Sequence, residues 1–213
     1  MRIKKLLLAI ATLTLVSATP VKHQFTAAEQ QQISISTPGL FSRSNAFNID
    51  LDALKPNEYS FPLPVGKATL RKNNVVEITT KDGDAVKAMF EGTVRLSRKQ
   101  PDTGYVIVIR HRNGLETVYA NNAENVVEVG QHVRAGQTIA IVGQRGGKFY
   151  CDFSIMIDGK RINPTAVVGL GSHRLHRHIL LCEKQYNYIN VSTIGEKVDF
   201  DDSKNFTTED VFT

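Results

Sequence analysis

The sequence predicts an all-β protein built around an antiparallel sheet. From about residue 59 onward, short apolar stretches recur between glycine-containing turns, and no amphipathic helical pattern separates them. The clearest hairpin runs from Val106–Arg112 to Leu115–Ala120 across Asn113-Gly114, a dipeptide that favours a two-residue turn between antiparallel strands. We therefore expect an antiparallel sheet core with a polar N-terminal segment and an irregular C-terminal extension.

The stretch GKFYCDFSIMIDGKRINP, residues 147–164, predicts one strand with two different faces. Its period of two separates Cys151, Phe153, Ile155 and Ile157 from Tyr150, Asp152, Ser154 and Met156. We expect the first, apolar face to be buried and the second, mixed face to be open to solvent. Asp158-Gly159 then predicts a tight turn into a shorter strand that stops at Pro164.

The first 18 residues are typical of a secretory signal peptide. Three basic residues precede an apolar run from Leu6 to Val16, and small residues follow near Ala18. The alternative is an uncleaved anchor helix, but the run is short for a span of about 20 residues. We expect an exported protein of the periplasm or cell envelope that has no stable membrane anchor after cleavage.

Export also changes the meaning of the net charge. Cleavage would remove three of the 26 basic residues and leave 23 against 21 acidic ones, so the formal charge would fall from +5 to +2. The basic composition is therefore no argument for a nucleic-acid partner, and no strand combines basic and aromatic side chains as a binding platform would.

Four further segments are expected along the chain. Residues 19–60 are interpreted as a polar linker, 61–168 as the β domain, 169–198 as an additional hairpin and 199–213 as an acidic mobile tail. An exported chain can form disulfides, so Cys151 and Cys182 either pair or remain separate buried thiols.

Two glycine-containing phrases, GDAVKAMFEGTV (Gly83–Val94) and VEVGQHVRAGQTIAIVGQRGG (Val127–Gly147), enclose the hairpin and are followed by GKRINP. In order and wording they resemble the lysostaphin/LytM-type zinc endopeptidases, which cut peptide cross-links in bacterial cell walls. The resemblance extends from about Phe61 to Val168 and implies a LytM-like sheet core, of the duplicated hybrid motif or barrel-sandwich type.

The resemblance also implies where a zinc site would lie. In the family, the ligands come from a His-x-x-x-Asp segment and from the second histidine of a His-x-His strand, and two further histidines assist catalysis. The corresponding residues of this chain are Asn73, Glu77, Asn121, Tyr150 and Asp152. All of the histidines are replaced, and the loop that leads to Asn73 is shortened. Glu77 and Asp152 remain as weak metal candidates, fewer than the three protein ligands of a catalytic zinc site.

Other histidines offer a weaker alternative. His173, His176 and His178 form either an adventitious metal site or a solvated basic patch together with neighbouring arginines. His111 lies beside the Asn113-Gly114 turn, where we expect a structural role.

Three functions remain open. The leading hypothesis is a non-catalytic LytM-like domain that binds cell-wall peptide or an envelope protein, such as a cell-wall hydrolase that it regulates. Its groove would use Asn73, Glu77, Asn121, Tyr150, Asp152 and Ser154, with no catalytic residue and no cofactor. The alternatives are a zinc metalloendopeptidase with altered ligands, which would require zinc, and a structural envelope module.

Overall fold

The computed structural model describes residues 25–194. The signal peptide expected at residues 1–18 and the acidic tail expected at 199–213 lie outside the described residues. Within residues 25–194, no helix is long and apolar enough to cross a membrane.

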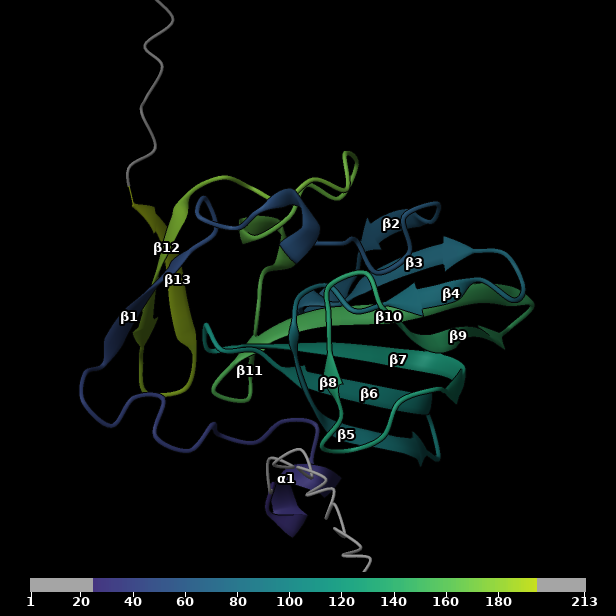
Figure 1. Cartoon of the computed structure of the whole chain (residues 1–213), viewed down its shortest axis with the longest axis horizontal. Coiled ribbons are helices and arrows are strands. Elements are labelled where there is room, and N and C mark those ends of the chain that lie inside the picture. Colours follow the sequence, from purple (N-terminus) through teal and green to yellow (C-terminus); the bar gives the residue numbers. More distant parts are fainter. Residues whose placement is uncertain (1–24, 195–213) are drawn as a thin grey trace, which may run out of the picture.

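The fold consists of two antiparallel sheets with very little helix, which confirms the predicted all-β class (Figure 1). The large sheet has ten strands: β2 (Lys67–Leu70), β3 (Val76–Thr80), β4 (Ala85–Lys87), β5 (Gly92–Gln100), β6 (Gly104–Arg110), β7 (Leu115–Asn125), β8 (His132–Val133), β9 (Thr138–Arg145), β10 (Lys148–Ile157) and β11 (Lys160–Ile162). Its main path runs β2-β3-β10-β9-β7-β6-β5-β8, so β2 and β8 are its ends and no closed barrel forms.

The second sheet lies beside the large one and has the order β1-β12-β13 (Figure 1). Its strands are β1 (Ala46–Asp50), β12 (Ile179–Lys184) and β13 (Ile189–Ile194). The helical elements are α1 (Ala27–Gln31) and three 3-10 turns, η1 (Pro56–Glu58), η2 (Lys72–Asn74) and η3 (Pro164–Ala166). The hairpin β12–β13 occupies the stretch where an additional hairpin was expected, and a strand from the expected linker completes the sheet.

The hairpin predicted around Asn113-Gly114 is present as β6 and β7, with a longer connection than expected. Arg110 pairs with Glu116, and the backbone N–H of His111 donates to the carbonyl of Leu115 at 2.9 Å. Four residues therefore connect the strands in place of the expected two, because His111 and Arg112 leave the ladder before the turn begins.

The first face of β10 is buried as predicted. Cys151, Phe153, Ile155 and Ile157 are fully buried in the main core, which fills the space between the large sheet and the three-stranded sheet. Cys182 of β12 lies in the same core, and both cysteines are free thiols.

The second face of β10 is also buried for most of its length, so the expectation of an open face was wrong. Tyr150 is 9%, Ser154 3% and Met156 0% exposed. Met156 belongs to a second apolar cluster with Leu96, Val106, Val108, Val118 and Ala120, and Ile33 packs against this cluster. Ile33 comes from residues 25–38, which we call the N-terminal strap.

The strap is anchored by one arginine of β5. Arg95 is 0% exposed and forms an ion pair with Glu116 of β7 at 2.8 Å. Its other guanidinium hydrogens are donated to backbone carbonyls of the strap, those of Gln32 and Ile33 at 2.8 Å each and that of Glu29. A buried guanidinium requires such partners, because each unsatisfied donor would lose its hydrogen bonds to water.

The other end of the strap is fixed at the Asp158-Gly159 turn between β10 and β11. The Asp158 carboxylate accepts the backbone N–H of Thr37 at 2.8 Å and pairs with the ammonium group of Lys184 at 2.8 Å. Gly159 lies so close to Ile35 that a Cβ there would be 2.7 Å from its carbonyl oxygen. The described part of residues 19–60 is therefore packed structure and not the expected linker.

We predict that Arg95→Ala destabilises the protein by about 3–5 kcal/mol, because it leaves the buried Glu116 without this partner and the strap carbonyls without donors. Urea unfolding followed by circular dichroism measures the effect. The control is Arg98→Ala, which removes an exposed guanidinium from the same strand and is expected to change stability by less than about 0.5 kcal/mol. Equal effects of the two substitutions would contradict the anchoring role of Arg95.

His111 has the structural role that the sequence suggested. Its imidazole is buried, with Nδ1 2.8 Å from the carbonyl oxygen of Glu91 and Nε2 2.8 Å from the Thr117 hydroxyl. Because a carbonyl can only accept, Nδ1 carries the proton and Nε2 accepts from Thr117. Burial lowers the pKa of His111 from 6.5 to about 4.

This depressed pKa predicts a loss of stability in acid. Between pH 6.5 and about 4 the unfolded chain binds a proton at His111 while the folded chain does not, so stability falls as pH falls, by up to about 3 kcal/mol. His111→Gln should flatten this part of the stability–pH curve, because it removes the group that is protonated only in the unfolded chain. An unaltered curve for His111→Gln would overturn the assignment.

Candidate functional site

The candidate site lies where β3 and β10 run side by side in the large sheet. Asp152 of β10 is directly opposite Glu77 of β3, and on its other side it pairs with Ala120 of β7. The two carboxylates that the sequence singled out are therefore cross-strand neighbours. Such a pair of like charges is unfavourable unless positive groups lie close by.

Arg71 supplies one of these positive groups. Its guanidinium forms an ion pair with the Glu77 carboxylate at 2.6 Å. The backbone N–H of Arg71 donates to the carbonyl of Val75 at 2.7 Å, which closes the connection between β2 and β3 and brings Arg71 back over β3. Glu77 is thus held by an arginine that precedes it by six residues.

Asp152 is half-buried, and its surroundings disfavour the charged form of its carboxylate. Burial and, second, the Glu77 carboxylate raise the pKa of Asp152, while the guanidinium groups of Arg145, Arg71 and Arg161 act in the opposite direction. Two carboxylates and three arginines therefore gather at this site.

Tyr150 and Ser154 flank Asp152 on β10 but lie deeper than expected. Burial, together with the Asp152 carboxylate, raises the pKa of the Tyr150 phenol. The Ser154 hydroxyl is 3.4 Å from Nε of Arg161, which donates to it. Asp152 is consequently the most accessible of the three predicted side chains on this strand.

Asn121 is placed in the sheet and does not face a groove. It is buried with a left-handed backbone (φ 61°), and its side-chain amide donates to the carbonyls of Tyr150 at 2.8 Å and Gly143 at 3.3 Å. At this point β10 changes its neighbour from β9 to β7. The amide bridges the discontinuity, so its donors are used within the fold.

Asn73 does not lie on a strand, unlike Glu77 and Asp152. It is exposed, in the 3-10 turn η2 that precedes β3, and has a left-handed backbone with φ 59°. Asparagine tolerates this conformation better than most residues do. The shortened loop noted in the sequence is this compact turn.

Sequence reasoning missed the three arginines of the site. Arg161 could have been found, because the Asp158-Gly159 turn sets a register in which Arg161 pairs with Met156, a residue of the mixed face. Arg145 ends β9 and pairs with Lys148 of β10, so its place follows from the β9–β10 hairpin. Arg71 could not have been found, since its contact with Glu77 depends on the conformation of the turn between β2 and β3, which no periodic pattern reports.

The donor set does not fit a catalytic zinc ion. Such a site needs three protein ligands and an open position, usually with imidazole or thiolate among them. Within the described residues no group of three or more His, Cys, Asp or Glu side chains is close enough to hold a metal. Glu77 is also already neutralised by Arg71.

The second histidine group has local structural contacts. His173 stacks on Phe61 with ring centroids 3.9 Å apart, and His176 stacks on His178 at 5.5 Å. His178 contacts the carbonyl oxygen of Ala166 through Nε2 at 2.9 Å. The three imidazoles do not converge on one point in a metal-binding group.

Comparison with known proteins places the site in a family. The family model described as Peptidase family M23 matches residues 71–164. The chain is 38% identical over 96 residues to the murein hydrolase activator EnvC of Escherichia coli (strain K12), covering 43% of this chain and 22% of EnvC. It is 35% identical over 98 residues to Stage II sporulation protein Q of Bacillus subtilis (strain 168), covering 42% of this chain and 34% of that protein.

A third relative carries an enzyme name. The DD-carboxypeptidase/endopeptidase Mpg of Neisseria meningitidis serogroup B (strain ATCC 13091 / M2091) is 29% identical over 101 residues, covering 46% of this chain and 23% of Mpg. Among solved structures, the complex of SpoIIIAH and SpoIIQ matches at 26% identity with a TM-score of 0.40, covering 58% of this chain and 92% of that chain.

The match to these curated relatives spans about a fifth to a third of their own length. The match to the family model includes the whole β3–β10 site, from Arg71 through Glu77 and Asp152 to Arg161. Residues 71–164 therefore form a domain of peptidase family M23, the family of the LytM and lysostaphin-type proteins that the sequence resembles.

Proposed function

We propose that this protein is an exported, non-catalytic M23-type module that binds a peptide, either from the cell wall or from an envelope protein such as a cell-wall hydrolase that it regulates. The observation that carries the proposal is the composition of the β3–β10 site. At the position that the sequence resemblance assigns to the family's metal site, two carboxylates and three arginines gather, and none of the corresponding residues of this chain is a histidine.

The strained Asp152 supports a functional role for this site. A carboxylate whose pKa is raised by burial and by a like charge lowers stability at neutral pH, where it is ionised. Ionisable groups with perturbed pKa values are found more often at functional sites than in parts of a protein that serve only its structure. The site would use its charges to pair with charged or amide groups of an extended peptide.

The strap limits where such a peptide could lie. It covers the end of the sheet around Met156 and Glu116, whereas Asp152, Glu77 and Arg71 remain partly exposed. The proposed contact surface is therefore the β3–β10 end of the face, shorter than the groove expected from the sequence.

The relatives support an envelope role in general terms. One is named a murein hydrolase activator, which favours regulation of a hydrolase over hydrolysis. The zinc metalloendopeptidase alternative rests on the family description and on the name of Mpg. A structural envelope module remains the third candidate if neither peptide nor metal binds.

We expect the purified protein to bind soluble peptidoglycan fragments or a cell-wall hydrolase, measured by isothermal titration calorimetry. Asp152→Asn and Arg71→Gln should each weaken binding about tenfold, since a hydrogen bond to a charged group contributes roughly 1.5–3 kcal/mol. Arg98→Gln, which alters an exposed arginine on β5, is the matched control. The proposal would be contradicted if the protein bound neither ligand, or if neither Asp152→Asn nor Arg71→Gln changed the affinity.

We expect less than about 0.1 zinc ion per chain after purification from zinc-containing medium, because the site offers two carboxylates and no imidazole. Elemental analysis by mass spectrometry measures this ratio. The matched control is the double variant Asn73→His, Asp152→His, which restores two of the family's ligand types and should retain more zinc. Stoichiometric zinc in the unaltered protein would favour the peptidase alternative.

A further inference from the structure

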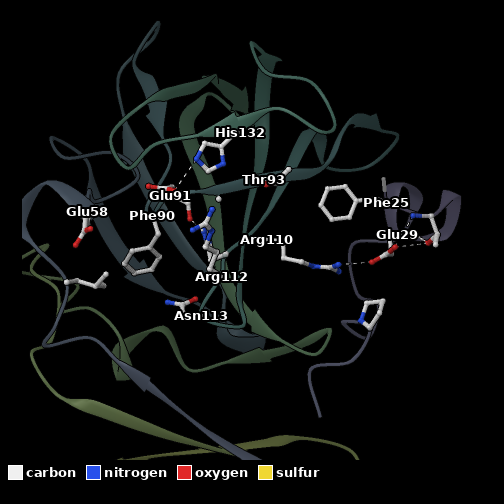
Figure 2. A pocket seen from close by; sticks show the side chains of 15 residues that line it. Phe25, Glu29, Glu58, Phe90, Glu91, Thr93, Arg110, Arg112, Asn113 and His132 are labelled. Carbon is white, nitrogen blue, oxygen red and sulfur yellow. Dashed lines mark hydrogen bonds and ion pairs between the residues drawn. The ribbon is translucent and has the colours of Figure 1, made fainter. Parts of the chain in front are cut away.

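A recess lies at a different part of the large sheet, where β6 ends and β7 begins. Its volume is about 880 Å³ (Figure 2). The strap forms one wall and Leu54 with Glu58 another. Residues 90–93, the end of β6 with the β6–β7 turn, and β8 complete it. It includes none of the residues of the β3–β10 site. The size is that of sites that enclose a small ligand.

Three aromatic rings line the recess, those of Phe25, Phe90 and His111. His111 is buried there as a neutral imidazole, and Phe90 meets it edge-on at a centroid distance of 5.5 Å. Phe25 of the strap lies over the guanidinium of Arg110 at 5.2 Å. Phe90 and His111 are themselves 3% and 4% exposed, so the partly exposed ring of Phe25 is the one that offers apolar surface to a bound molecule.

Most of the charges around the recess already have partners within the fold. Arg110 pairs with Glu29 at 2.7 Å and with Glu116 at 2.8 Å. His132 lies 3.2 Å from the Glu91 carboxylate, and Figure 2 shows the Arg110–Glu29 and His132–Glu91 contacts in the recess wall. The charges of these groups are therefore balanced within the fold, although the buried Nη2 of Arg110 has no hydrogen-bond partner among the described residues.

Two charged residues that line the recess, Arg112 and Glu58, lack, within the described part of the chain, the ion pairs that the other charged residues of the lining make. Arg112, in the β6–β7 turn, and Glu58, in η1, form no ion pair with any of residues 25–194. Arg112 is exposed, and the half-buried Glu58 accepts one hydrogen bond, from the backbone N–H of Lys55 at 2.7 Å. The recess thus presents one free cation and one free anion on separate walls.

We propose that the recess binds a short peptide by its two free termini. The peptide carboxylate pairs with Arg112, the terminal ammonium group pairs with Glu58, and an apolar side chain packs on the partly exposed ring of Phe25. Guanidinium–carboxylate pairs combine strong charge-assisted hydrogen bonds with a fixed geometry, which makes recognition of a free terminus specific. This site is independent of the proposed function at Asp152.

The test is calorimetric titration of the protein with the tripeptide Ala-Phe-Ala, in free, C-terminally amidated and N-terminally acetylated forms. We expect binding of the free peptide, with a loss of about tenfold on either modification. Arg112→Gln should cause the same loss for the free peptide and no further loss for the amidated one. Glu58→Gln should behave in the same way toward the acetylated peptide, and Arg98→Gln should have no effect.

Several results would overturn the inference. These are absence of binding at millimolar tripeptide, equal binding of free and amidated peptide, or unchanged affinity of Arg112→Gln. Asp152→Asn separates this site from the first one, because it should leave tripeptide binding intact. If Asp152→Asn abolished tripeptide binding, the peptide would be bound at the β3–β10 site and the recess would have no role.

Discussion

The architecture depends on the burial of one guanidinium. Arg95 is removed from solvent, so its donors need acceptors, and the carboxylate of Glu116 satisfies only two of them. The remaining acceptors are main-chain carbonyls of the strap. Seating the strap in this way also brings Ile33 onto the second apolar cluster. The hydrogen bonds of Arg95 and the packing of Ile33 therefore both depend on the strap. The strap covers the second apolar cluster of the large sheet.

The sequence predicted what side-chain periodicity can report and missed what it cannot. The alternation along β10 identified the buried face that contains Phe153, and Asn113-Gly114 located a hairpin. The strap was interpreted as a linker because its decisive contacts are backbone carbonyls, which leave no pattern in residue types. The candidate site was predicted in part: Glu77 and Asp152 do face each other, whereas the role of Asn121 as a bridge between β9 and β10 depends on a local change of pairing.

The β3–β10 site illustrates how substitution changes the chemistry open to a fold. Imidazoles in this position would offer neutral nitrogen donors to a metal ion. Glu77, Asp152 and Arg71 instead carry their own charges and partly neutralise one another. Such a set is suited to pairing with the polar groups of a partner.

Asp158 lies within the stretch that matches the family, but its side chain contacts residues on both sides of that stretch. One carboxylate joins the strap through Thr37 and the three-stranded sheet through Lys184, and the turn that carries it lies within residues 71–164. The piece of sequence shared with relatives thus ends inside a set of contacts contributed by both flanks. A fragment of residues 71–164, expressed alone or grafted into another protein, would lack the strap. Its second apolar cluster would be exposed, and Arg95 would lose the carbonyl groups that accept its hydrogen bonds. The stretch that matches the family is shorter than the set of residues that pack together in this structure.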